Sequence, residues 1–164
     1  TVVSRNRRSR STSKGSLVAS LQTTLLDESV APAVRADVAA LIDAEVSGKK
    51  GASGLAVKGG YGAVKKVGPG IIDDAVAKLW PSFVAKLDPF WQEYTAAGSS
   101  GRFGDHLVGR GDAVSDALLS VTDERVAGTS RKAIEKVYSS LRPSAKKHVT
   151  EALPRVGELV QKYA

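Results

Sequence analysis

Residues 53–87 read SGLAVKGGYGAVKKVGPGIIDDAVAKLWPSFVAKL, and an altered version of this stretch returns at residues 130–160. Each version opens on a serine and carries a tyrosine eight residues later, at Tyr61 or Tyr138. Each also contains two prolines in the same order. A repeated order of helix-capping and helix-breaking residues is typical of a duplicated supersecondary unit. We therefore interpret the chain as two copies of one helical unit.

The similarity continues outside these stretches. AVRADVAALIDAEV (33–46) aligns with AVSDALLSVTDERV (113–126), which pairs Asp43 with Asp123 and Val34 with Val114. The alternative is that Ala- and Val-rich amphipathic helices align with one another by chance. The paired tyrosines and prolines favour a duplication, in which each unit buries its apolar face against the other.

Apolar residues recur at helical spacing through both halves of the chain. This pattern predicts an all-α protein, with two related multi-helix units packed into one compact helical domain. The expected divisions are a disordered basic tail at 1–16, a first unit at 17–98, a connecting loop and short helix at 99–111, and a second unit at 112–164.

Serine, aspartate and proline residues set the expected helix starts. In chain order, the expected N-caps are Ser16 or Ser20 for a helix at 17–26, Ser29 with Pro32 in the first turn, Ser53, Asp88 before Pro89, and Asp112. A short helix holding Phe103, Leu107 and Val108 is expected before the helix that Asp112 caps.

Glycine and proline set the expected breaks. Gly68-Pro69-Gly70 is expected to separate two helices, and Pro81 and Pro154 are expected to break or kink one helix in each unit. Gly59, Gly60 and Gly62 each weaken a helix by about 1 kcal/mol relative to alanine. We expect these three glycines to let a neighbouring helix approach closely.

The formal net charge of +7 comes mainly from the start of the chain, because Arg5, Arg7, Arg8, Arg10 and Lys14 stand there without an acidic residue. The remaining residues are close to neutral. Such a segment has little to bury and is expected to be disordered. One interpretation is a solvated extension, and the other is an arm that contacts nucleic acid or an anionic surface.

The composition restricts the surroundings of the protein. There is no cysteine, so disulfide and thiol chemistry are excluded. No apolar run of about 18 residues occurs, and the basic start lacks the apolar region of a secretory signal. We therefore expect a cytoplasmic location without a transmembrane segment.

The sequence shows no clear catalytic, cofactor or metal site. The only histidines are His106 and His148, and although His148 and Glu151 share a helix face, no further ligand for a metal accompanies them. No motif of an activated nucleophile or a phosphate-binding loop is present. The expectation is a protein that is not an enzyme and has no cofactor or metal. Arg102, in a Gly/Ser-rich loop, is a candidate contact for an anion.

Five of the nine aromatic residues lie within fifteen positions: Trp80, Phe83, Phe90, Trp91 and Tyr94. Such a group commonly packs a core. Trp and Tyr also concentrate at interfaces and in apolar pockets. These five residues are therefore candidates for an interface or a pocket as well as for the core.

From about residue 17 onward, four stretches resemble a family of small, uncharacterised all-helical proteins from actinobacteria. These stretches are DAEV (43–46), YGAVKKVGPGI (61–71), DALLSVTDER (116–125) and KKHVTEALPRVGELV (146–160). The resemblance implies no activity. Residues 1–16 are not part of this resemblance.

The leading hypothesis for function is a non-enzymatic interaction or scaffold protein that binds a protein partner or itself. It follows from the repeat-like architecture and the lack of a catalytic constellation. The first alternative is binding of nucleic acid or an anionic surface through the basic tail. The second is binding of a small apolar ligand between the units, lined by Trp80, Phe83 and Trp91.

Overall fold

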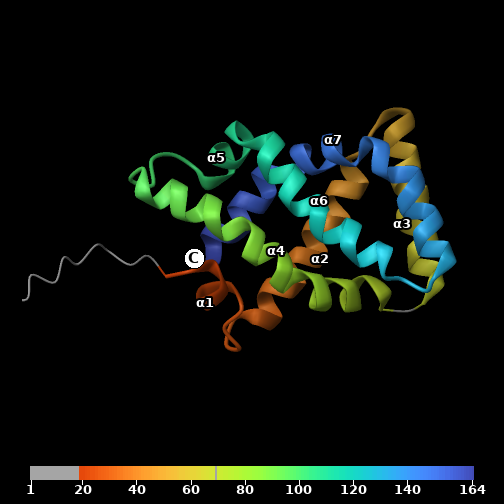
Figure 1. Cartoon of the computed structure of the whole chain (residues 1–164), viewed down its shortest axis with the longest axis horizontal. Coiled ribbons are helices and arrows are strands. Elements are labelled where there is room, and N and C mark those ends of the chain that lie inside the picture. Colours follow the sequence, from red (N-terminus) through yellow and green to blue (C-terminus); the bar gives the residue numbers. More distant parts are fainter. Residues whose placement is uncertain (1–18, 69) are drawn as a thin grey trace, which may run out of the picture.

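The computed structural model describes residues 19–68 and 70–164, and this part of the chain forms seven α-helices and no β-strand (Figure 1). In order they are α1 (Leu21–Leu25), α2 (Ala31–Gly48), α3 (Gly51–Val67), α4 (Ile71–Ala96), α5 (Phe103–Gly109), α6 (Gly111–Ala127) and α7 (Lys132–Tyr163). The prediction of one all-helical, compact domain is confirmed. The expected tail at 1–16 lies outside the described residues.

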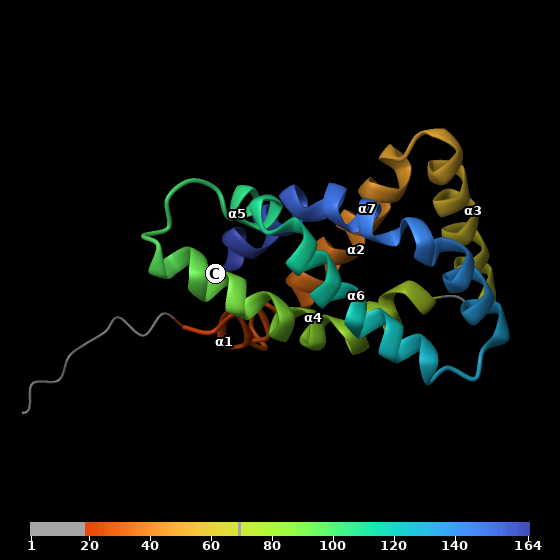
Figure 2. The same cartoon turned by 45° about the horizontal axis from the view of Figure 1, so that its top comes forward.

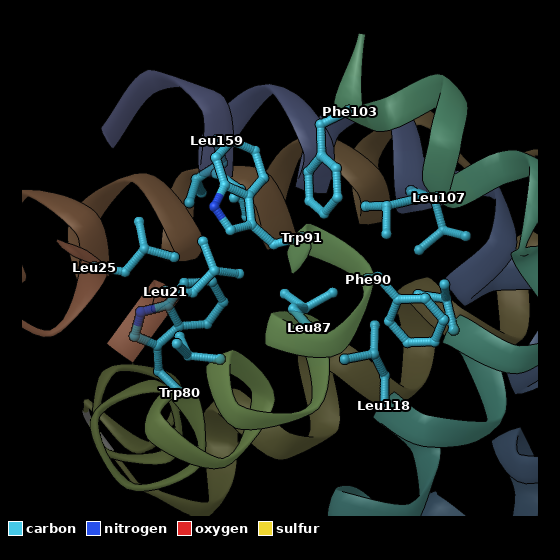
Figure 3. Packing of buried hydrophobic residues seen from close by; sticks show 14 of the residues in the cluster. Leu21, Leu25, Trp80, Leu87, Phe90, Trp91, Phe103, Leu107, Leu118 and Leu159 are labelled. Carbon is cyan, nitrogen blue, oxygen red and sulfur yellow. The ribbon is translucent and has the colours of Figure 1, made fainter. Parts of the chain in front are cut away.

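Helix α4 carries the stripe of side chains around which the core forms. Its buried residues recur every three or four positions: Val76, Trp80, Val84, Leu87, Phe90, Trp91 and Tyr94. This spacing places them on one side of a helix, and that side contacts α1, α2, α5 and α6. Figure 3 shows side chains from these neighbours, such as Leu21 and Phe103, converging on the stripe.

Helix α7 joins the two ends of the molecule. Its first half lies beside α3 at one end, and its second half packs on α5 at the other (Figure 1). It changes direction along its length in both views (Figures 1 and 2). Pro143 and Pro154 lie inside it, and a proline removes one backbone donor and bends a helix.

Pro81 and Pro154 were predicted to break or kink a helix, and the break is wrong. Helix α4 runs without interruption through Pro81 and Pro89, as α7 does through Pro154. A new helix therefore does not start after Asp88. Packing along the length of both helices outweighs the local effect of each proline, since helical stability in proteins comes mostly from tertiary contacts.

The expected break after α3 is confirmed, because α3 ends at Val67 and α4 begins at Ile71. Gly70 adopts φ +74°, a left-handed conformation that favours glycine. The corresponding part of α7, around Pro143, is continuous helix. The turn thus depends on the glycine at the end of the Gly-Pro-Gly sequence.

Three of the expected caps differ in the structure. Ser53 lies inside α3, whose N-cap is Lys50, and Ser29 bonds to Asp27 while Val30 occupies the N-cap of α2. Asp112 lies in the first turn of α6. The expectation for Ser20 is confirmed, because its side chain accepts a hydrogen bond from the Thr23 amide in α1.

Asp88 does act as a capping group, but for another helix. Its carboxylate accepts a hydrogen bond of 2.8 Å from the backbone amide of Leu21, the first residue of α1. The first amides of a helix have no partner within it, so this bond satisfies one of them from α4. It fixes the short α1 against the aromatic stripe.

Close approach of helices occurs at fewer glycines than the sequence indicates. A Cβ atom at Gly60 would lie 2.9 Å from Leu141 Cδ1 of α7, whereas Gly59 and Gly62 face open space. The tightest crossing is elsewhere, between α5 and α7. A Cβ atom at Gly157 would lie 2.2 Å from the Cα atom of Gly104.

Candidate functional site

The aromatic group predicted as a core, interface or pocket lies in the core. Trp80, Phe90, Trp91 and Tyr94 are buried, and the half-buried Phe83 packs against them. Trp91 meets Phe103 edge-to-face at 5.0 Å between ring centroids, and Figure 3 shows this pair inside the cluster. The grooves described below are lined by other residues. The hypothesis of an apolar pocket lined by these aromatic side chains stays a prediction.

Of the predicted anion contacts, Arg102 alone lies in the part of the chain that the structure describes. Arg102 is the exposed N-cap residue of α5 and lines neither groove. The tail arginines Arg5, Arg7, Arg8 and Arg10 lie outside the described residues.

An open groove, called here the junction groove, lies where the α3–α4 turn meets the α6–α7 turn. Its volume is about 360 Å³. Most of its wall is apolar, formed by Val64, Val67, Ile71, Ala75, Leu79, Val126 and Ile134. Four charged residues stand around it, namely Asp74, Lys78, Arg125 and Arg131. Every lining residue is at least partly exposed to solvent, so the groove is open.

A tyrosine–aspartate contact borders each side of this region. The Tyr61 hydroxyl of α3 donates to the Asp43 carboxylate of α2, and Lys65 Nζ lies 3.6 Å from the same carboxylate. The Tyr138 hydroxyl of α7 donates to the Asp123 carboxylate of α6. We call these two arrangements the tyrosine clamps.

The second clamp also has a cation, because Arg142 donates from Nε and Nη2 to the two oxygens of Asp123, at 2.8 and 3.1 Å. Such bidentate pairs hold a fixed geometry. Lys65 and Arg142 each stand four residues after their tyrosine. Sequence alignment had paired the tyrosines and the aspartates, but it did not identify them as contacts.

The clamps change the acidity of their members. Burial, followed by the bond to Asp43, raises the pKa of Tyr61 to about 12. Burial and Asp123 likewise raise the pKa of Tyr138. The hydrogen bond from Tyr61 lowers the pKa of Asp43, and Arg142 followed by Tyr138 lowers the pKa of Asp123. Each clamp therefore keeps a neutral phenol against an ionised carboxylate at neutral pH.

A second pocket, of about 450 Å³, lies between the α2–α3 turn and the middle of α7. We call it the lysine pocket. It is lined by Glu45, Gly48, Lys49, Lys50 and Ser53 from one side and by Lys147, His148, Glu151, Pro154 and Arg155 from the other. Lys49 and Lys50 form the turn between α2 and α3.

Lys49 is the buried cation of this pocket, with a side chain 7% exposed. Its Nζ atom lies 2.7 Å from Glu151 and 3.2 Å from Glu45. The bond from Lys49 lowers the pKa of Glu151. A buried lysine stays charged only with such partners, so Lys49 ties the α2–α3 turn to α7. No sequence pattern indicates a partner 102 positions away.

Among residues 19–68 and 70–164, no group of three or more His, Cys, Asp or Glu side chains has the arrangement of a metal site. His148 Nδ1 and Glu151 Oε2 are 3.8 Å apart. None of the helices in this part of the chain is long and apolar enough to span a membrane.

A comparison with known protein families matches residues 21–164 to DUF6918, a family of unknown function. The chain belongs to this family. The match confirms the expected resemblance to a family without an assigned activity. Comparison with curated proteins and with solved structures gives no match.

Proposed function

We propose that this DUF6918 protein is a non-enzymatic interaction protein, and that the junction groove receives apolar side chains from a partner protein. The observation that carries the proposal is an apolar wall open to solvent. Val67, at its edge, leaves 38% of its surface exposed. Exposed apolar surface with a polar rim is a common mark of a protein-binding site.

The shape of the groove favours a protein partner over a small molecule. Small-molecule sites bury about 70–90% of their ligand, which requires deep walls. Here none of the lining residues is buried. An open apolar groove of this kind suits a few apolar side chains on a helix or a loop of a partner.

The charges beside the groove specify the chemistry of that partner. Lys78, Arg125 and Arg131 stand around it against the single carboxylate of Asp74. Complementary charge guides association and orients the partner. The expected partner segment therefore carries apolar residues flanked by Asp or Glu.

Site-specific photo-crosslinking tests this proposal. A benzophenone amino acid replaces Val67 in the groove, and in the control protein it replaces Leu55, which is on the same helix and 71% exposed but outside the groove. In lysate of the source organism we expect an adduct to a defined protein from position 67 and not from position 55. The captured segment, made as a peptide, should bind the purified chain.

Charge reversal distinguishes groove binding from adventitious capture. Arg125→Glu combined with Arg131→Glu should weaken binding of the captured peptide at least tenfold, which is about 1.4 kcal/mol. The proposal would be contradicted by equal crosslinking yields from positions 67 and 55. It would also be contradicted by a captured peptide that binds the double arginine variant as tightly as the parent. If the adduct is a second copy of the chain, the interaction is self-association.

A small apolar ligand in the same groove is the second candidate. The volume of about 360 Å³ falls in the range of roughly 300–1,000 Å³ that ligand sites occupy. Native mass spectrometry of the purified protein would then show a bound mass, and Ile134→Asp should release it. A ligand of this kind would also raise the melting temperature.

We also infer that the two halves descend from one duplicated unit. The tyrosine clamps support this inference, because Asp43 and Tyr61 align with Asp123 and Tyr138 in sequence and make the same contact in each half. The halves differ in their connections, since α3 and α4 are separate helices while α7 is continuous. The junction groove would then lie between equivalent turns of the two units.

A further inference from the structure

The charges in the lysine pocket divide into an inner balanced group and an outer surplus. Inside, Lys49 bonds to Glu45 and Glu151, and Arg155 Nη1 lies 3.2 Å from Glu45. Two cations thus meet two carboxylates. Lys50 and Lys147 also line the pocket, and in the described part of the chain neither has a carboxylate within 4 Å. The pocket therefore carries two uncompensated positive charges.

His148, in the wall of the pocket, meets the inner group only at 3.8 Å, between its Nδ1 and Glu151 Oε2. Its side chain is 13% exposed, and neither ring nitrogen has a hydrogen-bond partner among the described residues. Buried polar atoms normally have a partner, and those that lack one require an explanation. A ligand that draws the ring toward the pocket would supply a partner.

The first turn of α3 adds donors on the opposite wall. Lys50 is the N-cap residue, its side chain makes no capping bond, and the first turn contains no acidic residue. The leading amides of a helix favour an anion. Ser53, in the same turn, also lines the pocket.

We propose that the lysine pocket binds a phosphate group, with Lys50 and Lys147 as the counter-charges and Ser53 as a hydrogen-bond donor. An internal ion-pair network explains Lys49 and its partners, but among residues 19–68 and 70–164 it leaves the outer lysines without a carboxylate within 4 Å and the imidazole without a hydrogen bond. A phosphate offers several strong acceptor oxygens to such converging donors. The site shares no lining residue with the junction groove and is independent of the function proposed there.

The test uses inorganic pyrophosphate as the probe and the two histidines as reporters. His106 and His148 are the only histidines of the chain, so their imidazole NMR signals are readily assigned. Titration at low ionic strength should shift the His148 signal saturably and leave His106 unchanged. Calorimetry on the same sample gives the dissociation constant.

Two matched double variants locate the site. Lys50→Gln with Lys147→Gln should weaken binding at least tenfold, whereas Lys58→Gln with Lys86→Gln removes the same charge from exposed positions outside the pocket and should change it less than twofold. Ser53→Ala removes one hydroxyl without altering charge and should weaken binding several-fold. Far-UV circular dichroism confirms that each variant is folded.

A second experiment distinguishes a soluble phosphate from a lipid headgroup. It measures sedimentation of the protein with vesicles of phosphatidylcholine, either alone or mixed with phosphatidic acid. Saturable binding of pyrophosphate assigns the site to soluble phosphates, and sedimentation only with phosphatidic acid assigns it to lipid headgroups. In either case the Lys50→Gln, Lys147→Gln double variant should weaken the binding that is observed. Binding in neither experiment, or equal weakening by the two double variants, would overturn the proposal.

Discussion

Gly157 is the residue at which a single added methyl group should do the greatest damage. Its Cβ would lie 2.2 Å from the Cα atom of Gly104, and a backbone atom cannot move aside as a side chain can. Overpacking typically costs 1–3 kcal/mol and occasionally more. For Gly157→Ala we expect a loss of about 3 kcal/mol, which lowers the melting temperature by roughly 6–12 °C. Differential scanning calorimetry measures both.

Gly59→Ala is the matched control at the residue scale. Gly59 also lies inside a helix, but a Cβ atom there meets nothing within 4 Å. Since alanine is the better helix former by about 1 kcal/mol, this variant should melt at the same temperature or higher. A Gly157→Ala protein as stable as the parent would show that α5 and α7 separate at little cost.

At the scale of helix pairs, the two tyrosine clamps should differ in strength. Tyr138 also lies 2.9 Å from the Thr122 hydroxyl, and its Asp123 partner is fixed by Arg142. A hydrogen bond contributes about 0.5–1.5 kcal/mol, so Tyr138→Phe should fall near the top of this range and Tyr61→Phe near the bottom. Urea unfolding of both variants measures the difference. Equal losses would mean that Arg142 and Thr122 add nothing to the second clamp.

Which contacts the sequence could predict depends on how far apart their partners are along the chain. Helical periodicity predicted the all-α class, and alignment paired Tyr61 with Tyr138, because both depend on local spacing. The contact of Lys49 has no signal in the local pattern, since its carboxylate on α7 is 102 positions away. Pro81 was expected to break or kink a helix because its local effect is strong, but tertiary packing keeps α4 continuous.

For the whole molecule, ionised carboxylates fasten α7 to its neighbours. Lys162 and Tyr163 lower the pKa of Asp37 on α2, Arg142 lowers that of Asp123 on α6, and Lys49 lowers that of Glu151. A carboxyl with a lowered folded-state pKa stabilises the fold above its unfolded pKa of about 4, and this stabilisation is lost as pH falls through the folded value.

The melting temperature should therefore fall between about pH 5 and pH 3. Asp37→Asn removes one of the three titrating contacts, so its melting temperature should depend less on pH in this range. Thermal unfolding across the series, at constant ionic strength, makes the comparison. A variant that follows the same pH curve as the parent would exclude the contact of Asp37 as a source of the acid sensitivity.

The tyrosine clamps make the stability of the fold depend on pH in the alkaline range. Because the pKa of Tyr61 rises to about 12 on folding, the neutral phenol contributes stability that is complete below its unfolded pKa of about 10. That contribution is lost as pH rises from 10 toward 12. Absorbance at 295 nm should show a late tyrosinate phase near pH 12, and Tyr61→Phe should reduce its amplitude. A phase that persists unchanged in Tyr61→Phe would mean that its hydroxyl is not held by Asp43 in solution.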